Sequence, residues 1–208
     1  MNTLVKPFSA LRPKTEHAHT LIAPPYDVVN EEEVRALISK SPNSFLCVSR
    51  PETEFPLGTN PNSEAIHAKA KENLERLKSH GLLVRDDTPA YYVYKMKMGS
   101  HEQTGIALTA SVDAYNDNIV KKHELTRPSK EDDRTQNMLS LNAQTGPVLS
   151  VYRNNKSLKN LLLDIKKNTP LFEVKGQYEV IHTIWRIKDA MTINMITSIF
   201  EEMQNIYI

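Results

Sequence analysis

The chain has 208 residues, of which 39% are hydrophobic and 25% charged, and these values are typical of a globular rather than a disordered protein. Its 26 Lys and Arg residues nearly balance its 25 Asp and Glu residues, which disfavours broad electrostatic binding to nucleic acid or to anionic lipid. The only cysteine, Cys47, excludes an intramolecular disulfide, and its apolar neighbours predict a buried thiol. We find neither a secretory signal nor a membrane-spanning run, and expect a soluble cytoplasmic protein.

The first predicted elements follow an irregular opening that runs to Pro25. Asn30 is predicted to cap a helix with Glu33 as its capping-box partner. The apolar run 45–50 predicts a buried strand, and residues 51–61 predict a proline-rich loop. A helix is then predicted from Ser63 to a stop at Gly81. Its inward face consists of Ile66, Ala70, Leu74 and Leu77.

The second part of the chain mixes strands and helices. Strands are predicted over 91–98, 103–112, 119–124, 147–153, 171–174 and 179–187. Helices are predicted from Ser129, with Asp132 as its capping partner, over 157–167, and after Asp189. The last helix has a predicted core stripe of Met191, Met195, Ile199 and Met203. Because strict βαβ alternation is absent, the pattern predicts an α+β fold with a mixed, largely antiparallel sheet. We expect one region over 1–208, with a subdivision near 81–90 as an alternative.

The densest group of polar residues covers 120–134. His123 and Glu124 point to opposite faces of a strand, so one of them can face a cleft. On the following helix Lys130, Asp133 and Arg134 share a face with Asn137. Two cations one turn apart suit an anion, and arginine suits phosphate in particular. The alternative interpretation is a solvated helix face on which carboxylates balance the cations.

A second candidate segment is Ile22-Ala23-Pro24-Pro25-Tyr26-Asp27-Val28-Val29-Asn30. Its two prolines predict an extended approach to the following helix. Asp27 is a candidate general base or a ligand of a metal–phosphate complex, and Tyr26 can stack on a ligand. Alternatively, Asp27 caps a turn and Tyr26 packs on the prolines. Gln103-Thr104-Gly105 and Gln144-Thr145-Gly146-Pro147 predict glycine turns, and the seven histidines show no metal-binding spacing.

Several segments together resemble one family of bacterial and archaeal proteins, called domain of unknown function 1015. The resemblance lies in segments that follow one another in the expected order: Pro7-Phe8-x-Ala10-Leu11-Arg12-Pro13, Ala23-Pro24-Pro25-Tyr26-Asp27-Val28-Val29, Ser44-Phe45-Leu46, Arg50-Pro51-Glu52, His123-Glu124-x-Thr126-x(3)-Lys130-Glu131-x-Asp133-Arg134 and Thr145-Gly146-Pro147-Val148. That family is related to the free-serine kinases of the ParB/sulfiredoxin-like superfamily. The specific match covers about residues 5–153.

The resemblance implies a nucleotide-dependent phosphoryl transfer to a small hydroxyl compound such as free serine, with Mg²⁺ and ATP or ADP. Phosphoryl transfer needs cations around the phosphates and a carboxylate at the hydroxyl. We therefore expect catalytic roles for Asp27, His123 and Glu124. The expected ligand-binding residues are Tyr26, Thr126, Lys130, Asp133 and Arg134.

The resemblance implies a further segment that the 208 residues do not contain. Family members continue after a strand like Ile206-Tyr207-Ile208 into a phosphate-binding Gly-His-His-Arg turn. We expect the 208 residues to be the N-terminal part of such an enzyme, with a non-enzymatic nucleotide- or ligand-binding module as the alternative. DNA binding is disfavoured because no helix is rich in Lys or Arg. We further expect the C-terminal end to pack poorly or to be covered in a homodimer.

Overall fold

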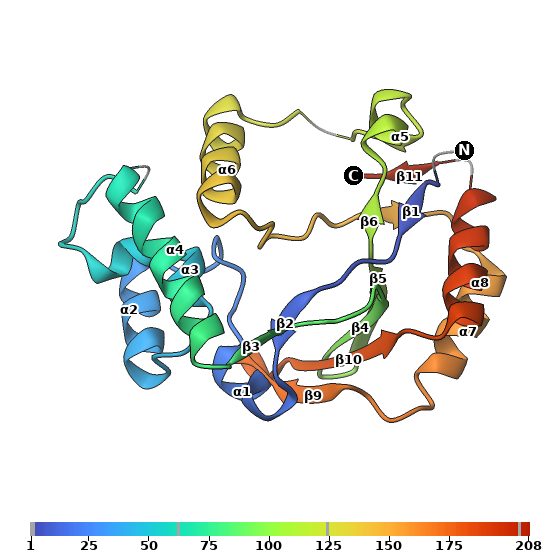
Figure 1. Cartoon of the computed structure of the whole chain (residues 1–208), viewed down its shortest axis with the longest axis horizontal. Coiled ribbons are helices and arrows are strands. Elements are labelled where there is room, and N and C mark those ends of the chain that lie inside the picture. The colour runs from blue at the N-terminus through green and yellow to red at the C-terminus, as the bar shows by residue number, and fades with distance from the viewer. Residues whose placement is uncertain (1–2, 62, 124, 204) are drawn as a thin grey trace.

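The computed structural model describes residues 3–61, 63–123, 125–203 and 205–208, and of Lys130 the backbone alone. Its largest sheet is antiparallel throughout, with the strand order β5-β4-β10-β9. These strands are β4 (Tyr91–Met98), β5 (His101–Ala107), β9 (Phe172–Lys175) and β10 (Ile181–Ile187). β4 and β5 form a hairpin whose turn contains Gly99 at a φ of 57°, a conformation in which glycine carries no steric penalty. The predicted strand pair is thus present, with β4 in the interior of the large sheet and β5 at its edge (Figure 1).

Three smaller sheets complete the β-structure. They contain β1 (Val5–Lys6) with β6 (Thr109–Ala110), β2 (Leu11–Pro13) with β3 (Leu83–Arg85), and β7 (Val120–Lys121) with β11 (Ile206–Tyr207) and β8 (Val151–Tyr152). β11 is the central strand of its sheet, parallel to β7 and antiparallel to β8, and Ile206 is buried. The expectation of a poorly packed C-terminal end is therefore wrong, because this strand is hydrogen-bonded on both edges.

The helices surround the large sheet in two groups. They are α1 (Ala18–Leu21), α2 (Glu31–Lys40), α3 (Leu46–Ser49), α4 (Glu64–Ser79), α5 (Val112–Asn116), α6 (Pro128–Leu141), α7 (Lys156–Ile165) and α8 (Ala190–Glu201), with 3₁₀ turns η1 (Thr15–His17), η2 (Pro51–Glu54) and η3 (Gln177–Glu179). Figure 1 shows α2, α3, α4 and α6 on one side of the sheet and α7 and α8 on the other. The fold is thus mixed α and β with mainly antiparallel sheets, as predicted. No helix in the described ranges is long and apolar enough to cross a bilayer.

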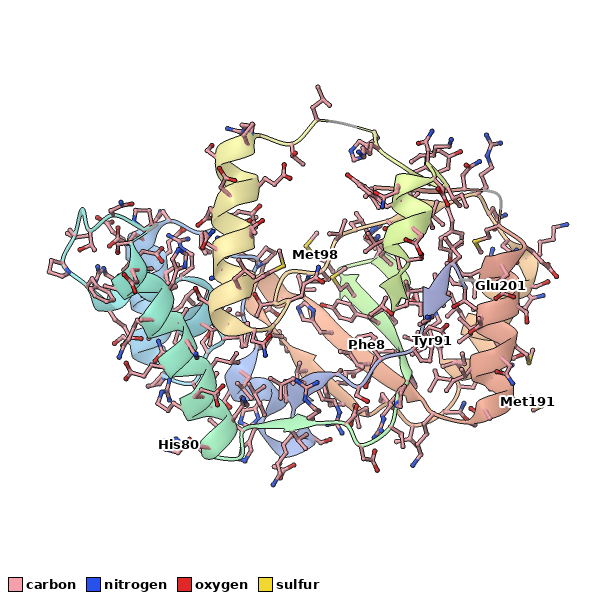
Figure 2. All side chains as sticks on the ribbon, turned by 45° about the horizontal axis from the view of Figure 1, so that its top comes forward. Phe8, His80, Tyr91, Met98, Met191 and Glu201 are labelled. Atoms are coloured by element: carbon pink, nitrogen blue, oxygen red, sulfur yellow. The ribbon has the colours of Figure 1, made fainter. Side chains whose placement is uncertain are left out.

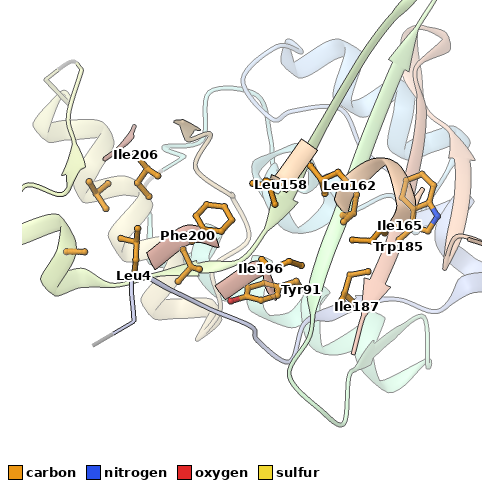
Figure 3. Close-up of a cluster of buried hydrophobic side chains, with 14 residues drawn as sticks. Leu4, Tyr91, Leu158, Leu162, Ile165, Trp185, Ile187, Ile196, Phe200 and Ile206 are labelled. Atoms are coloured by element: carbon orange, nitrogen blue, oxygen red, sulfur yellow. The ribbon is translucent and has the colours of Figure 1, made fainter. Parts of the chain in front are cut away.

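Separate hydrophobic clusters stabilise the two sides. One face of the large sheet, including Tyr91 and Trp185, packs against α7 and α8, whose contributions include Leu158 and Ile196 (Figure 3). On the other side, α3, α4 and the end of α6 share a cluster that includes Cys47. Each fully buried aliphatic side chain contributes about 1.5–3 kcal/mol to stability. The buried thiol and the predicted inward face of α4 are both confirmed.

Three predicted elements are wrong in type, in position or in extent. Residues 45–50 contain the short helix α3 rather than a strand, since a run of three buried apolar side chains suits either element. The glycine turn predicted at 103–105 lies inside β5. β5 is followed by the separate strand β6, so the predicted strand over 103–112 is divided in two.

Helix ends were predicted more successfully than one of the helix faces. The capping box of Asn30 and Glu33 is present, and Asp189 accepts a hydrogen bond from the Thr192 amide. α6 begins at Pro128 with Arg127 as its cap, which replaces the predicted start at Ser129, because proline suits the first helical position. The predicted core stripe of α8 is correct in its second half only. Ile199 and Met203 pack against the cluster that contains the buried Ile196 and Phe200, whereas Met191, labelled in Figure 2, is 73% exposed and Met195 46%.

Candidate functional site

The loop of Tyr26 and Asp27 is fixed to the helical side of the molecule by Arg50. Nη1 of Arg50 donates hydrogen bonds to the carbonyl oxygens of Tyr26 and Val29, both at 2.7 Å. Nε of Arg50 donates to Oε1 of Glu52 at 2.5 Å, which orients the guanidinium. The Arg50-Pro51-Glu52 segment therefore holds the candidate loop in place. Sequence reasoning did not assign this role, because nothing local connects Arg50 to a loop in another part of the chain.

Helix α6 brings Arg134 onto the ring of Tyr26. The guanidinium carbon of Arg134 lies 4.4 Å from the ring centroid, which is within the range of a cation–π interaction. Asp133 binds the same guanidinium through Oδ2, at 3.1 Å from Nε and 2.6 Å from Nη2. The structure thus joins the two segments that the sequence singled out independently. The tyrosine, the arginine and its carboxylate form one polar surface.

The position of α6 follows from the side of the helix that is buried. Leu141 belongs to the same hydrophobic cluster as Leu74 and Leu77 of α4, and Asn137 is buried. Positions 134, 137 and 141 lie on one face of an α-helix. This face therefore turns toward the protein, and Arg134 at its upper end lies over Tyr26 rather than in open solvent. Asn137 and Leu141 on this face are buried, whereas the partly exposed ion pair of Arg134 with Asp133 also agrees with the alternative in which carboxylates balance the cations.

Asp27 remains available to a ligand. Its side chain is exposed, next to Tyr26 in the loop that Arg50 holds. Among the side chains that the structure describes, none forms a hydrogen bond or ion pair with the Asp27 carboxylate. The loop backbone is thus anchored, and the exposed carboxylate can accept hydrogen bonds from a ligand.

The remaining predicted site residues do not all converge on this surface. The His123 amide donates to the carbonyl of Ile208 at 2.9 Å, so His123 lies at the end of β7 beside the C-terminal strand. Thr126 donates through Oγ1 to Oε2 of Glu131 at 2.9 Å and thus stabilises the start of α6. Glu124 and the side chain of Lys130 lie outside the described part of the chain. The structure brings together Tyr26, Asp133 and Arg134, and Asp27 is the next residue after Tyr26 in the same loop.

Both arginines at the site are already paired with carboxylates. Arg50 has Glu52 as its partner, and Arg134 has Asp133. A guanidinium has five N–H donors, and these contacts leave Nη1 of Arg134 available to an incoming acceptor. The Arg134 side chain is 37% exposed, so that an anion can approach it from solvent. The surface is therefore suited to bind phosphate through directed hydrogen bonds, not through a large excess of positive charge.

A second cluster of charged residues explains the N-terminal segment around Arg12. Asp86, whose side chain is 2% exposed, accepts hydrogen bonds from Nε of Arg12 at 3.0 and 3.1 Å and from the Tyr92 hydroxyl at 2.5 Å, and it forms an ion pair with Nη1 of Arg186 at 3.0 Å. Burial alone would raise the pKa of Asp86, but the bonds from Arg12 and Tyr92 and the two cations lower it. Burial and the Asp86 bond raise the pKa of Tyr92 to about 12. This enclosed cluster connects β2, β3 and the large sheet, and its role is structural.

Within the described residues, no three His, Cys, Asp or Glu side chains are grouped so as to hold a metal ion. This geometry does not suit a dedicated metal cage. Mg²⁺ that arrives with a nucleotide requires only one or two carboxylates, since phosphates and water supply its other ligands. Asp27, with its unoccupied carboxylate, fits that more limited role.

The family comparison covers almost the whole chain. The family model described as "Protein of unknown function (DUF1015)" matches residues 5–208. No curated protein and no solved structure matches the chain.

Proposed function

Because the chain belongs to the DUF1015 family, whose description assigns no activity, we propose its function from the geometry of the site. We propose that the surface of Tyr26, Asp27, Asp133 and Arg134 binds a nucleotide and takes part in phosphoryl transfer to a small hydroxyl compound in the cytoplasm. The observation that carries the proposal is the 4.4 Å contact between Arg134 and the Tyr26 ring. The resemblance of the sequence to relatives of the free-serine kinases supports the same chemistry.

Each side chain has a distinct task in this proposal. Nη1 of Arg134 donates to a phosphate oxygen, and Asp133 keeps the guanidinium in the required orientation. The ring of Tyr26, which is 36% exposed, offers stacking area to the base or ribose. Asp27 accepts the proton of the acceptor hydroxyl. The hydroxyl oxygen then forms the new bond to phosphorus, while the bond from that phosphorus to the bridging oxygen of the leaving nucleotide breaks.

When bound with the nucleotide, Mg²⁺ neutralises charge on the phosphates, and Asp27 is the described residue that would hold it. Asp27 would then orient the acceptor as a metal ligand instead of taking its proton. Both roles require the carboxylate to face the phosphates, which the exposed position of Asp27 allows. His123 and Thr126 have no assigned role at the phosphates in this proposal. The described contacts of His123 lie at the C-terminal strand, and those of Thr126 lie at the start of α6.

A second candidate function is binding without turnover. It is favoured by the pairing of both arginines with carboxylates, which leaves little net positive charge to stabilise a transferring phosphoryl group. In that case the same surface would hold a nucleotide as a structural or regulatory ligand. The two functions differ in whether phosphoryl transfer takes place, and the proposed role of Asp27 as the catalytic carboxylate applies only if it does.

The experiment is a titration of the chain with ADP and ATP in the presence of Mg²⁺, together with an assay for transfer to small hydroxyl compounds. Arg134→Ala is expected to weaken nucleotide binding about tenfold, because it removes a charged hydrogen bond. Asp27→Asn is expected to retain binding and to lower the transfer rate at least about 100-fold. Arg85→Ala removes a control arginine whose Nη1 donates to the Ser9 carbonyl.

Three results separate the alternatives. Binding that is equally strong in Arg134→Ala and in the Arg85→Ala control contradicts the proposed site. Transfer that persists in Asp27→Asn contradicts the role of Asp27. Binding that depends on Arg134 without any measurable transfer favours the module without turnover.

A further inference from the structure

A small cavity lies directly beside the Tyr26 loop. Its volume is about 140 Å³, it is open to solvent on one side, and it is lined by α1, by the segment from α2 to α3 and by the start of the loop between β9 and β10. Ile22, Leu37 and Leu46 provide apolar walls. His19 and Lys175 are among the polar residues of its lining. The exposed lining is more polar than apolar, so a ligand here would be held mainly by hydrogen bonds and charge.

The size of the cavity limits what can enter. Since one water occupies about 30 Å³ in the liquid, the volume corresponds to roughly four or five waters. Sites for larger organic ligands have volumes of about 300–1,000 Å³. The cavity of about 140 Å³ is therefore too small for a nucleotide and suits a metabolite with a few carbon atoms.

The cavity is connected to the proposed site through the chain itself. Pro24 lines the cavity and belongs to the same loop as Tyr26 and Asp27. Arg50 holds the backbone of this loop through the Tyr26 and Val29 carbonyl oxygens. A molecule in the cavity would thus lie on one side of an anchored loop that bears the candidate carboxylate.

The loop between β9 and β10 places an exposed carboxylate beside the lysine of the cavity lining: the Lys175 side chain is 58% exposed and that of Glu179 79%. Nζ of Lys175 forms an ion pair with Oε2 of Glu179. Tyr178 and Glu179, which are not glycines, have left-handed backbone conformations with φ of 55° and 61°. Such conformations are unfavourable for side-chain-bearing residues and are maintained only by their surroundings. The carboxylate that pairs with Lys175 therefore belongs to a segment with an unfavourable backbone conformation.

In contrast, the first residue of this loop is fixed. An added Cβ at Gly176 would lie 2.8 Å from Cδ1 of Ile22 and 2.9 Å from Nε2 of His182, so the loop backbone sits directly against both side chains. His182 is held in turn by the Tyr94 hydroxyl, 2.5 Å from Nδ1. The backbone next to Lys175 is thus fixed by packing, whereas its partner Glu179 lies at the strained tip of the loop.

One serine supplies a polar group for a second part of a ligand. Ser41 lines the cavity, and its hydroxyl donates to the Thr20 carbonyl at 3.0 Å. A hydroxyl that has donated its proton still has lone pairs with which it can accept a hydrogen bond. The cavity lining therefore combines a cation for a carboxylate with an acceptor for a ligand hydroxyl.

We propose that this cavity binds a small hydroxycarboxylate, whose carboxylate takes the place of Glu179 on Lys175 and whose hydroxyl lies toward Ser41. The binding of such a compound follows from the cavity alone. Its assignment as the acceptor of the phosphoryl group rests on the function proposed above.

The test uses three probes of similar size: lactate, propionate and 1,2-propanediol. Lactate carries both the carboxylate and the hydroxyl, and each of the others lacks one of them. Binding is followed in the full chain by NMR titration of the signals from His19 and Gly176, without nucleotide. We expect lactate to bind more tightly than propionate, and propanediol to bind most weakly.

Two substitutions at the ion pair should act in opposite directions. Lys175→Ala is expected to weaken lactate binding about tenfold, because a charged hydrogen bond is lost. Glu179→Gln is expected to tighten it severalfold, since the competing carboxylate is removed. Lys167→Ala is the matched control. Lys167 is also exposed, lies just after the end of α7 and forms an ion pair with Asp164 in the last turn of that helix. Arg134→Ala should leave lactate binding unchanged.

The cavity proposal is overturned if lactate does not shift these signals, if propanediol binds equally well, or if Lys175→Ala behaves like Lys167→Ala. None of these outcomes bears on nucleotide binding at Arg134. Conversely, loss of the nucleotide site with lactate binding intact would refute the proposed function and leave the cavity proposal standing.

Discussion

At the scale of single residues, three arginines show how similar sequence signals lead to different roles. Arg12 is enclosed with Asp86 and is structural, whereas Arg50 orients a loop through two carbonyl oxygens. Of the three, Arg134 combines an aromatic contact with partial exposure and with a nitrogen, Nη1, that has no hydrogen-bond partner among the described side chains. The sequence could not separate these roles, because each depends on partners that are distant in the chain.

The Asp86 cluster makes a testable prediction about stability. Asp86→Asn is expected to lower the free energy of unfolding at pH 7 by about 3 kcal/mol, because it leaves two arginines without their buried carboxylate. Since folding lowers the pKa of Asp86, the stabilisation is present above the unfolded pKa of about 3.9 and is lost as the pH falls through the folded value.

Urea unfolding of the wild type and of Asp86→Asn from pH 7 down to pH 3 measures this effect. The difference between the two proteins should be largest at neutral pH and should shrink in acid. A constant difference over the whole range would show that the lost contacts, and not the charge of the carboxylate, stabilise the fold.

At the scale of elements, the sequence predicted correctly the helices whose apolar residues are compatible with only one buried face. The face of α4 is correct because its four inward positions have helical spacing and polar neighbours. α8 is apolar on several sides, so the pattern permitted a stripe through Met191 as well as the buried one through Ile196. The apolar run in α3 carries no periodicity at all, and its true conformation follows from its packing against α4.

Two helix starts provide a matched prediction. Asn30 accepts the Glu33 amide at 2.9 Å, and its own amide donates to the Glu33 side chain at 2.8 Å. Ser63 occupies the equivalent cap position of α4, but its side chain forms no capping bond. Asn30→Ala should therefore lower stability by about 1 kcal/mol, and Ser63→Ala should have almost no effect.

Chemical unfolding of the two variants under identical conditions measures this difference. Equal losses would mean that the capping box of α2 does not function as the structure indicates. Because the Val29 carbonyl at the start of α2 is bound to Arg50, Asn30→Ala should also loosen the Tyr26 loop and weaken nucleotide binding slightly.

At the scale of the whole molecule, the candidate site depends on tertiary packing. Tyr26 and Arg134 come from opposite halves of the chain, and the packing of α6 against α4 brings them together. Sequence patterns predicted each segment as a candidate but could not predict their contact. The same reason explains why the cavity beside Pro24 was not predicted, since its lining comes from α1, α2, α3 and the β9–β10 loop.

The most direct measurement of the central claim is a double-mutant cycle on ADP binding with Tyr26→Ala and Arg134→Ala. If the two side chains form one binding surface, each single substitution should weaken binding about tenfold and the double substitution only slightly more, because the second change removes an interaction already lost. Fully additive losses would show that the residues act separately, and wild-type affinity in all three variants would show that this surface does not bind the nucleotide.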